Sequence, residues 1–118
     1  MANPVTEFQI LAKDPDAVAK FFARVLGWNV NANNALGYRR VDTGSPKGIQ
    51  GGIWPAPPQA PDFVQLFVEV DDVAATVAKA EQAGAQVIVP PSKLPEGDEM
   101  AVLLAPNQMS FGVVRRAR

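Results

Sequence analysis

The sequence contains no histidine and no cysteine among its 118 residues. Without cysteine the chain can form no disulfide, no thiolate metal site and no thiol nucleophile. Without histidine it has no Ser/His or Cys/His pair for nucleophilic catalysis. Side-chain metal ligands would then be oxygen donors, and general acid–base work would fall to Glu7.

An excess of charge of one sign is also lacking. Lys and Arg number 11 against 12 Asp and Glu, and the net charge is -1. The basic trio Arg115, Arg116 and Arg118 is typical of a solvated tail, so we expect no nucleic-acid partner. The first residues carry no export signal, and no apolar run reaches the roughly 18 residues of a membrane span. We expect a cytoplasmic protein that does not bind membranes.

The first half of the chain predicts a strand, a helix and three more strands. Asp14 offers an N-cap oxygen, Pro15 suits the first helical position, and Gly27 is placed to end the helix. Between them, apolar residues recur at helical spacing. The predicted strands cover Val5–Ala12, Trp28–Val30, Leu36–Asp42 and Ile49–Trp54.

The second half repeats this order after a proline-rich segment. Asp71 or Asp72 caps its helix, which Gly84 ends. Seven residues separate Glu7 from Asp14, and the same spacing separates Gln65 from Asp72. The strands are predicted over Phe63–Val70, Gln86–Val89, Glu99–Leu104 and Ser110–Arg115, with a long loop over 90–98.

A repeated order with a repeated spacing indicates two copies of one unit. We predict a first βαβββ module over residues 1–57, a linker over 58–61 and a second βαβββ module over 62–118. The hydrophobic content of 47% is enough for the core of one domain.

Three segments resemble the glyoxalase / bleomycin-resistance / extradiol dioxygenase proteins, the vicinal oxygen chelate (VOC) superfamily. Asp14–Trp28 resembles their helix motif D-P-x-x-x-x-x-F-[YF]-x-x-x-L-G-[WF]. Val68–Val73 resembles the entry to their second module, and Ala105–Val113 their closing D-P-x-G-N-x-[FI]-[GE]-[LV] turn and strand. The resemblance implies an α+β fold in which two βαβββ modules form a curled mixed sheet around a pocket. The loop over 90–98 is long enough to cover the mouth of that pocket, although its charged residues are more typical of a solvated loop.

The metal-dependent members of this superfamily place one ligand on the first and one on the last strand of each module. The resemblance carries these positions onto Glu7, Gly52, Gln65 and Gly112, with Gln50 as a neighbour of Gly52 on the same face. Glycine has no donor, and one carboxylate with one or two amides is too little for a tight transition-metal site. We therefore expect no metal and no cofactor, while weak Mg²⁺ or Ca²⁺ binding stays open.

Residues that share a strand face with Glu7 and Gln65 should line the pocket. Arg39 and Arg40 point to opposite faces, so one of them is expected to point inward, and the sequence does not say which. Trp28 is predicted to pack in the core. For Trp54, a place in the core or at the sheet edge and a place in the pocket wall fit the sequence equally well. The predicted ligand-binding residues are Glu7, Gln9, Tyr38, Arg40, Gln50, Trp54, Phe63, Gln65 and Phe67.

We expect a glyoxalase/bleomycin-resistance-like protein that binds a small amphipathic ligand in the pocket between the modules without a metal. The alternative is a VOC-type lyase, isomerase or dioxygenase-like enzyme that uses a weakly held divalent metal or Glu7 as the catalytic general base. A third reading is an interaction module in which Trp54 and the proline-rich linker form a partner surface. Besides the small-molecule ligand, the expected partner is a second copy of the chain in a homodimer.

Overall fold

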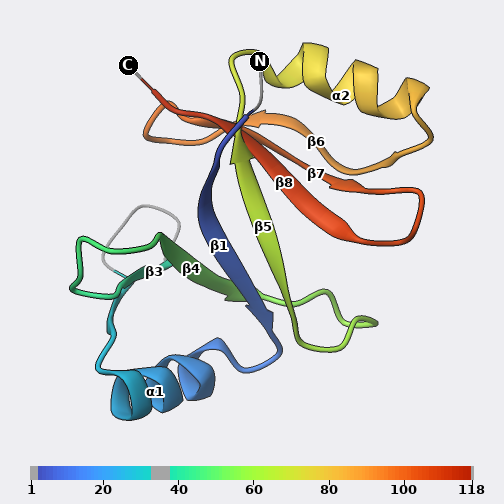
Figure 1. Cartoon of the computed structure of the whole chain (residues 1–118). Coiled ribbons are helices and arrows are strands. Elements are labelled where there is room, and N and C mark those ends of the chain that lie inside the picture. The colour runs from blue at the N-terminus through green and yellow to red at the C-terminus, as the bar shows by residue number, and fades with distance from the viewer. Residues whose placement is uncertain (1–2, 33–37, 118) are drawn as a thin grey trace. The chain divides into compact units, whose positions relative to one another are not determined.

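The computed structural model describes residues 3–32 and 38–117 (Figure 1). In chain order its elements are β1 (Val5–Ala12), α1 (Pro15–Leu26), β2 (Asn29–Asn31), β3 (Arg39–Asp42), β4 (Gln50–Pro55), β5 (Phe63–Glu69), α2 (Val73–Gln82), β6 (Gln86–Lys93), β7 (Glu99–Leu104) and β8 (Ser110–Arg115). The order β-α-β-β-β therefore occurs twice, as the sequence repeat predicts.

The chain divides into two compact units. The first unit is Glu7–Gln65, and the second unit is Met1–Thr6 together with Leu66–Arg118. In the first unit the strand order is β2-β3-β4-β1, and in the second it is β6-β7-β8-β5. The first and last strands of each module pair in parallel, and the other neighbours pair antiparallel. These mixed sheets, each with one helix, confirm the predicted α+β fold.

Helix α1 begins and ends as its sequence predicts. The side chain of Asp14 accepts a hydrogen bond from the backbone N–H of Ala17 at 3.1 Å, which satisfies one unpaired donor of the first turn. Pro15 occupies the start of the helix. At the other end Gly27 has φ 72°, and its N–H donates to the carbonyl of Ala23. A left-handed terminator of this kind favours glycine because glycine has no Cβ.

The sequence offered Asp71 and Asp72 as N-caps of helix α2, and the structure distinguishes them. The carboxylate of Asp72 accepts from the backbone N–H of Ala75 at 3.0 Å, and the hydroxyl of Thr76 donates to the carbonyl of Asp72. Asp72 is therefore the N-cap, and Asp71 precedes the helix without capping it. The helix ends at Gln82, followed by Gly84 at φ 99°.

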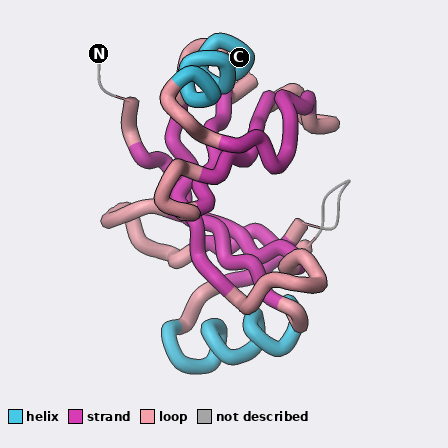
Figure 2. The backbone as a smooth tube through the Cα atoms, turned by 90° about the vertical axis from the view of Figure 1, so that its right-hand side faces the viewer, coloured by secondary structure: helices cyan, strands magenta, loops and turns pink. Residues whose placement is uncertain are grey.

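In the first unit, α1 packs on one face of the sheet (Figure 2). The buried residues of this core are Ile10, Ala12, Val41 and Ile53, and Phe8, Val18, Ala19, Phe22, Trp28 and Val30 pack against them. Phe8, Ile10 and Ala12 alternate along β1, so the remaining side chains of that strand point to the other face. We call that other side, opposite α1, the helix-free face of the first unit.

The second unit is apolar on both faces of its sheet. On the side of α2, Val73 and Val77 pack against Leu103 and Val113. On the opposite side a separate cluster forms around Phe67, Val102 and Val114, with Val89 and Met100 packed against it. The two helix-free faces therefore differ in chemistry, although the two modules share their element order.

One predicted loop is wrong in part. Residues 90–93 continue strand β6 to Lys93, so the connection to β7 covers only 94–98. Pro90 and Pro91 are tolerated because β6, paired with β7, is an edge strand of the described sheet. The pairing also shifts register between Val87 and Ser92. This shortened loop removes the reason to regard 90–98 as a cover. The predicted strand over Leu36–Asp42 is seen as β3, and its residues 36 and 37 lie outside the described part.

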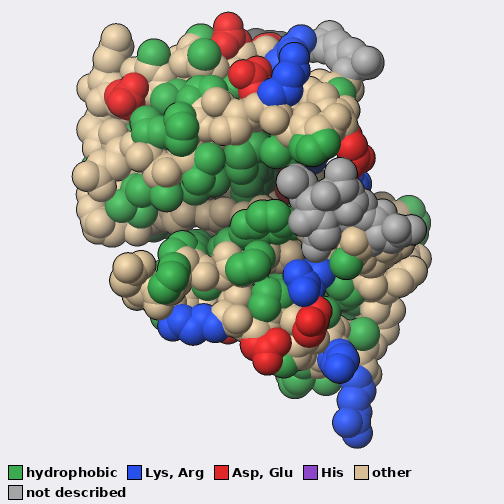
Figure 3. All heavy atoms as spheres, turned by 180° about the vertical axis from the view of Figure 1, so that it is seen from behind, with side chains coloured by type: hydrophobic (Ala, Val, Ile, Leu, Met, Phe, Trp, Pro, Cys, Tyr) green, Lys and Arg blue, Asp and Glu red, His purple; other side chains and the backbone are tan. Residues whose placement is uncertain are grey.

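Neither helix within residues 3–32 and 38–117 is long and apolar enough to cross a membrane. On the face shown in Figure 3, Lys and Arg side chains alternate with Asp and Glu side chains among polar and apolar ones. The described residues on that face thus form no large patch of one charge.

The N-cap of α2 gives a stability prediction with an adjacent control. Replacing Asp72 by Ala removes the carboxylate that accepts from Ala75, and the free energy of unfolding should fall by about 1 kcal/mol. Asp71→Ala, which removes the same charge one residue earlier, should change it by less than about 0.5 kcal/mol. Urea unfolding of both variants measures the difference, and equal losses would mean that charge rather than capping matters.

Candidate functional site

Most of the predicted site residues gather on the helix-free face of the first unit. The backbone register places Glu7 beside Gln50, Gln9 beside Gly52 and Leu11 beside Trp54 on the parallel strands β1 and β4. On the other side of β4, Arg40 of β3 lies opposite Gly52. Side chains at matched positions of neighbouring strands point to the same face. The predicted site residues on this face are therefore Glu7, Gln9, Arg40, Gln50 and Trp54. Tyr38 and Gln65 join them through the contacts described below.

The register also identifies which glycines correspond in the two modules. Gly52 pairs with Gln9, two residues after Glu7. Gly112 pairs with Phe67, two residues after Gln65. Gly52 and Gly112 therefore occupy equivalent positions, and Gln50 does not.

Each of these two glycines lies directly beneath an aromatic ring. A Cβ on Gly52 would overlap the hydroxyl and ring carbons of Tyr38, and a Cβ on Gly112 would overlap the ring of Phe67. Real side chains do not approach one another so closely, so neither position can carry a side chain while its ring stays in place. The two glycines are thus positions where an aromatic ring meets the backbone.

Tyr38 also contacts Trp54. The two ring centroids lie 5.4 Å apart with an interplanar angle of 53°. This separation lies within the range of favourable aromatic pairs. Both side chains are half-buried, so part of this aromatic surface is accessible to solvent.

An amide pair lies next to this aromatic surface. Gln65 is buried, with 4% of its surface exposed, and its Nε2 donates to Oε1 of Gln9 at 2.6 Å. Because the oxygen of Gln9 accepts from Gln65, the amino group of Gln9 is the end that can donate to another molecule. The pair therefore orients Gln9 as a donor on the helix-free face.

Gln50 serves the neighbouring turn. Its Oε1 accepts from the backbone N–H of Thr43 at 2.6 Å, and its Nε2 donates to the carbonyl of Ser45 at 3.3 Å. Both ends of the amide are thus engaged in holding the turn between β3 and β4. These hydrogen bonds indicate a structural role for Gln50, which the sequence predicted as a ligand-binding residue.

The two neighbouring arginines divide between the faces of the sheet. Arg39 lies on the side of α1, where its Nε donates to a carboxylate oxygen of Asp16 at 2.8 Å. This hydrogen bond and the positive charge of Arg39 lower the pKa of Asp16 from its usual value. Arg40 is exposed on the opposite face and is the arginine that accompanies Gln9.

The aromatic residues singled out in the sequence also lie in different parts of the structure. Trp28 packs in the helix-side core, with its ring centroid 5.0 Å from that of Phe22 and 5.6 Å from that of Phe8. Phe63 is half-buried at the start of β5 in the first unit. Phe67 belongs to the second unit and fills the apolar cluster over Gly112. The proposed roles of Phe63 and Phe67 in ligand binding stay predictions.

The residues at the four expected ligand positions do not fit a transition metal. Gly52 and Gly112 have no side-chain donor, and the amino group of Gln65 is turned toward Gln9. Glu7, half-buried, is then the one carboxylate of the set. Among the described residues no group of three or more acidic side chains is placed to hold a metal ion. One carboxylate and one amide oxygen leave too few charged donors for Zn²⁺, Ni²⁺ or Fe²⁺.

The chain matches a known family over nearly its whole length. The family described as a glyoxalase-like domain matches residues 7–114. The chain belongs to this family, within the glyoxalase / bleomycin-resistance / extradiol dioxygenase superfamily. Two proteins named "Putative glyoxylase CFP32", from Mycobacterium bovis and Mycobacterium tuberculosis, are 33% identical over 112 residues, which is 92% of this chain and 42% of each relative. The chain therefore spans about two-fifths of the length of these curated relatives.

Solved structures confirm the fold. Hypothetical protein BH1468 from Bacillus halodurans superposes with a TM-score of 0.69 at 12% identity, covering 100% of this chain and 97% of that one. Methylmalonyl-CoA epimerase from Mycobacterium tuberculosis superposes with a TM-score of 0.64 at 15% identity, covering 97% of this chain and 88% of that one. At these identities the similarity establishes the fold and not the reaction.

The contact between Tyr38 and Gly52 predicts an energetic coupling. Gly52→Ala should lower the free energy of unfolding by about 1–3 kcal/mol, because the new Cβ displaces the Tyr38 ring. In a Tyr38→Ala background the same change should cost clearly less, so the double variant should be less destabilised than the sum of the single variants. Strictly additive losses in urea unfolding would contradict the contact.

Proposed function

We propose that the helix-free face of the first unit binds a small amphipathic ligand without a transition metal. The ligand has a planar apolar part and at least one carbonyl or carboxylate oxygen. The observation that carries this proposal is the Tyr38 ring over Gly52, which fills the space that a metal ligand at this position would need.

The aromatic pair supports the apolar half of this recognition. Tyr38 and Trp54 lie in ring contact and are half-buried. Burying a planar ring or chain against this surface would remove apolar area from water, which stabilises a complex by about 25 cal/mol per Å² before the costs of association. Tyr and Trp also offer one polar group each.

Two donors beside Gly52 support the polar half. Gln9 and Arg40 flank this glycine from the neighbouring strands, one on each side. The amide of Gln9 is oriented by Gln65, and the guanidinium of Arg40 is a planar group of N–H donors. Donors of this kind are suited to the oxygen atoms of a carbonyl or carboxylate.

The second candidate function is enzymatic, with Glu7 as the general base. Relatives named as glyoxylase and as methylmalonyl-CoA epimerase favour it. Glu7 lies on the same strand face as Gln9, two residues before it in β1. In this function Glu7 would accept a proton from a ligand whose carbonyl is held by Gln9 and Arg40. Glu7→Gln should then abolish turnover while leaving ligand affinity within about three-fold.

Binding can be tested through the indole signal of Trp54 in ¹H–¹⁵N NMR spectra. Titration with a set of small aromatic ketones and carboxylates should shift this signal. Arg40→Gln should weaken binding of a carboxylate by about ten-fold, the effect of losing one charge-assisted hydrogen bond of about 1.4 kcal/mol.

The matched control for that experiment is Arg39→Gln. It removes the same charge one residue away, on the opposite face of β3. It should leave binding near Trp54 within about two-fold, because a charge screened by the sheet and by salt contributes little. Equal losses in the two variants would contradict recognition by Arg40 and would indicate an effect of net charge.

Metal content gives an independent test. The purified protein should contain Zn, Ni, Fe and Mn well below one equivalent, and ligand binding near Trp54 should be unchanged by a chelator, because the donor set holds one carboxylate. Elemental analysis checks the first statement and NMR titration in chelator the second. One equivalent of a transition metal, or binding that a chelator abolishes, would overturn the metal-free part of the proposal.

A further inference from the structure

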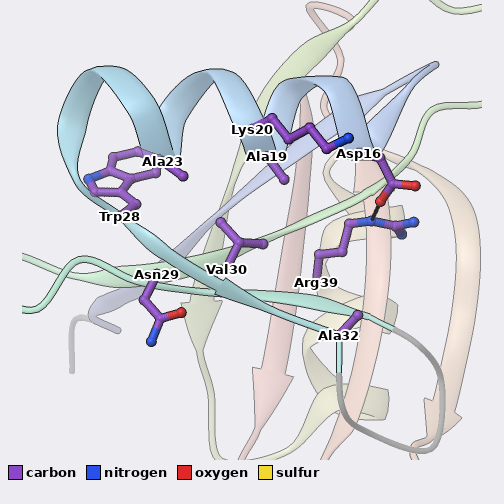
Figure 4. A pocket seen from close by; sticks show the side chains of 9 residues that line it. All are labelled: Asp16, Ala19, Lys20, Ala23, Trp28, Asn29, Val30, Ala32 and Arg39. Carbon is purple, nitrogen blue, oxygen red and sulfur yellow. Dashed lines mark hydrogen bonds and ion pairs between the residues drawn. The ribbon is translucent and has the colours of Figure 1, made fainter.

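A hollow lies on the helix side of the first unit, between α1 and β2 (Figure 4). Its volume is about 340 Å³, near the lower end of the range for small-molecule sites. All of its walls come from the first unit. The residues that line it are Asp16, Ala19, Lys20, Ala23, Trp28, Asn29, Val30, Ala32 and Arg39. None of them belongs to the site on the helix-free face. We call this hollow the α1–β2 groove.

The middle of the α1–β2 groove is apolar, and Ala19, Trp28 and Val30 of its lining pack against the core. Ala19 and Ala23 lie one turn apart on α1, so their small side chains leave room above Val30. Trp28 closes one end (Figure 4), and its indole stacks on Phe22 at a centroid distance of 5.0 Å with an angle of 22°. An aromatic side chain held by the core in this way presents a preformed surface to a ligand.

The opposite end is charged. Arg39 pairs with Asp16 there, and Lys20 extends from α1 toward the pair (Figure 4). The side chain of Asp16 is 72% exposed, whereas that of Arg39 is 23% exposed. An ion pair with one partner this exposed is weak, so a second carboxylate can compete for the guanidinium. With two cations and one anion, this end keeps a net positive charge.

We propose that the α1–β2 groove binds a small organic carboxylate, with its apolar part between Ala19, Ala23 and Trp28 and its carboxylate at Arg39 and Lys20. The ligand's carboxylate takes the place that Asp16 holds in the free protein. The Asp16–Arg39 bond at 2.8 Å shows that this guanidinium is positioned to donate to a carboxylate oxygen from the side of α1. A guanidinium matches the planar carboxylate group, and Lys20 adds a point charge.

This inference does not rest on the function proposed for the helix-free face. The two tryptophans make the two sites distinguishable, since Trp28 lines the groove and Trp54 lies on the opposite face with Tyr38. Each indole N–H gives one signal in a ¹H–¹⁵N spectrum. A ligand in the groove shifts the Trp28 signal, and a ligand on the helix-free face shifts the Trp54 signal.

The experiment titrates the full chain with naphthoate and, as the uncharged match, naphthamide. Naphthoate should shift the Trp28 indole signal with a saturable dissociation constant on the order of 1 mM, the strength expected for a ligand of this size. Naphthamide should bind at Trp28 roughly ten-fold more weakly, because it lacks the charge that Arg39 and Lys20 recognise. Equal affinities, or a titration that never moves the Trp28 signal, would overturn the proposal.

Three variants test the role of each charged side chain in the groove. Asp16→Asn removes the competing carboxylate and should tighten naphthoate binding at Trp28 by roughly two- to five-fold. Arg39→Gln and Lys20→Gln should each weaken it by roughly three- to ten-fold. Unchanged or weaker binding in Asp16→Asn would contradict the displacement of Asp16, and unchanged binding in both cation variants would contradict carboxylate recognition.

Arg40→Gln is the matched control here. It lies on the helix-free face and should leave the Trp28 titration unchanged within about two-fold. If naphthoate shifts only Trp54, the groove proposal fails and the function proposed for the helix-free face stands. If naphthoate shifts only Trp28, the groove proposal stands, and the helix-free face gains no support from this ligand.

Discussion

The close approach of an aromatic ring to a glycine is the contact on which the candidate site depends. Tyr38 lies over Gly52 in the first unit, and Phe67 lies over Gly112 in the second. A ring can lie flat on a strand only where no Cβ projects from it. The resemblance to the superfamily places metal ligands at these two positions, and a ligand side chain there would need the space that the ring occupies.

The two modules use this shared contact for different chemistry. In the first unit the neighbours of the glycine are Gln9 and Arg40, and in the second they are Phe67 and Val102. The helix-free face of the second unit is consequently apolar, while that of the first carries donors beside an aromatic pair. One backbone pattern thus supports an apolar cluster in one unit and a face with polar donors in the other. This asymmetry favours a single ligand site per chain on that face.

The sequence predicted the fold well because the signals that define it are local. Asp14 and Asp72 cap the helices, and the spacing from each strand to its cap repeats. The strand alternation also placed Glu7 and Gln9 on a common face correctly. The prolines at the edge strand β6 misled the prediction, because their effect depends on whether a neighbouring strand needs their N–H.

The contacts that give the site its chemistry could not be predicted in the same way. The bond between Gln65 and Gln9 joins residues 56 positions apart, and no local pattern specifies it. The sequence could not say which of Arg39 and Arg40 lies on which face of the sheet. The strand register and the ion pair of Arg39 with Asp16 place Arg39 on the side of α1 and Arg40 on the opposite face. Gln50 looked like a ligand donor in sequence, whereas its hydrogen bonds hold a turn.

Two faces of the first unit now carry different candidate sites. The helix-free face combines the aromatic pair with the donors beside Gly52, and the α1–β2 groove combines Trp28 with Arg39 and Lys20. Their chemistry overlaps, since both contain an aromatic side chain and a cation. Only a probe that reports on each face separately can assign a ligand to one of them.

The central claim is that Tyr38 occupies the space above Gly52, and proton NMR tests it most directly. Nuclear Overhauser effects should connect the ring protons of Tyr38 to the α-protons of Gly52, and the ring current should shift those α-protons upfield. The absence of both signals in the native protein, with Gly52 α-protons at ordinary shifts, would contradict the contact on which the candidate site depends.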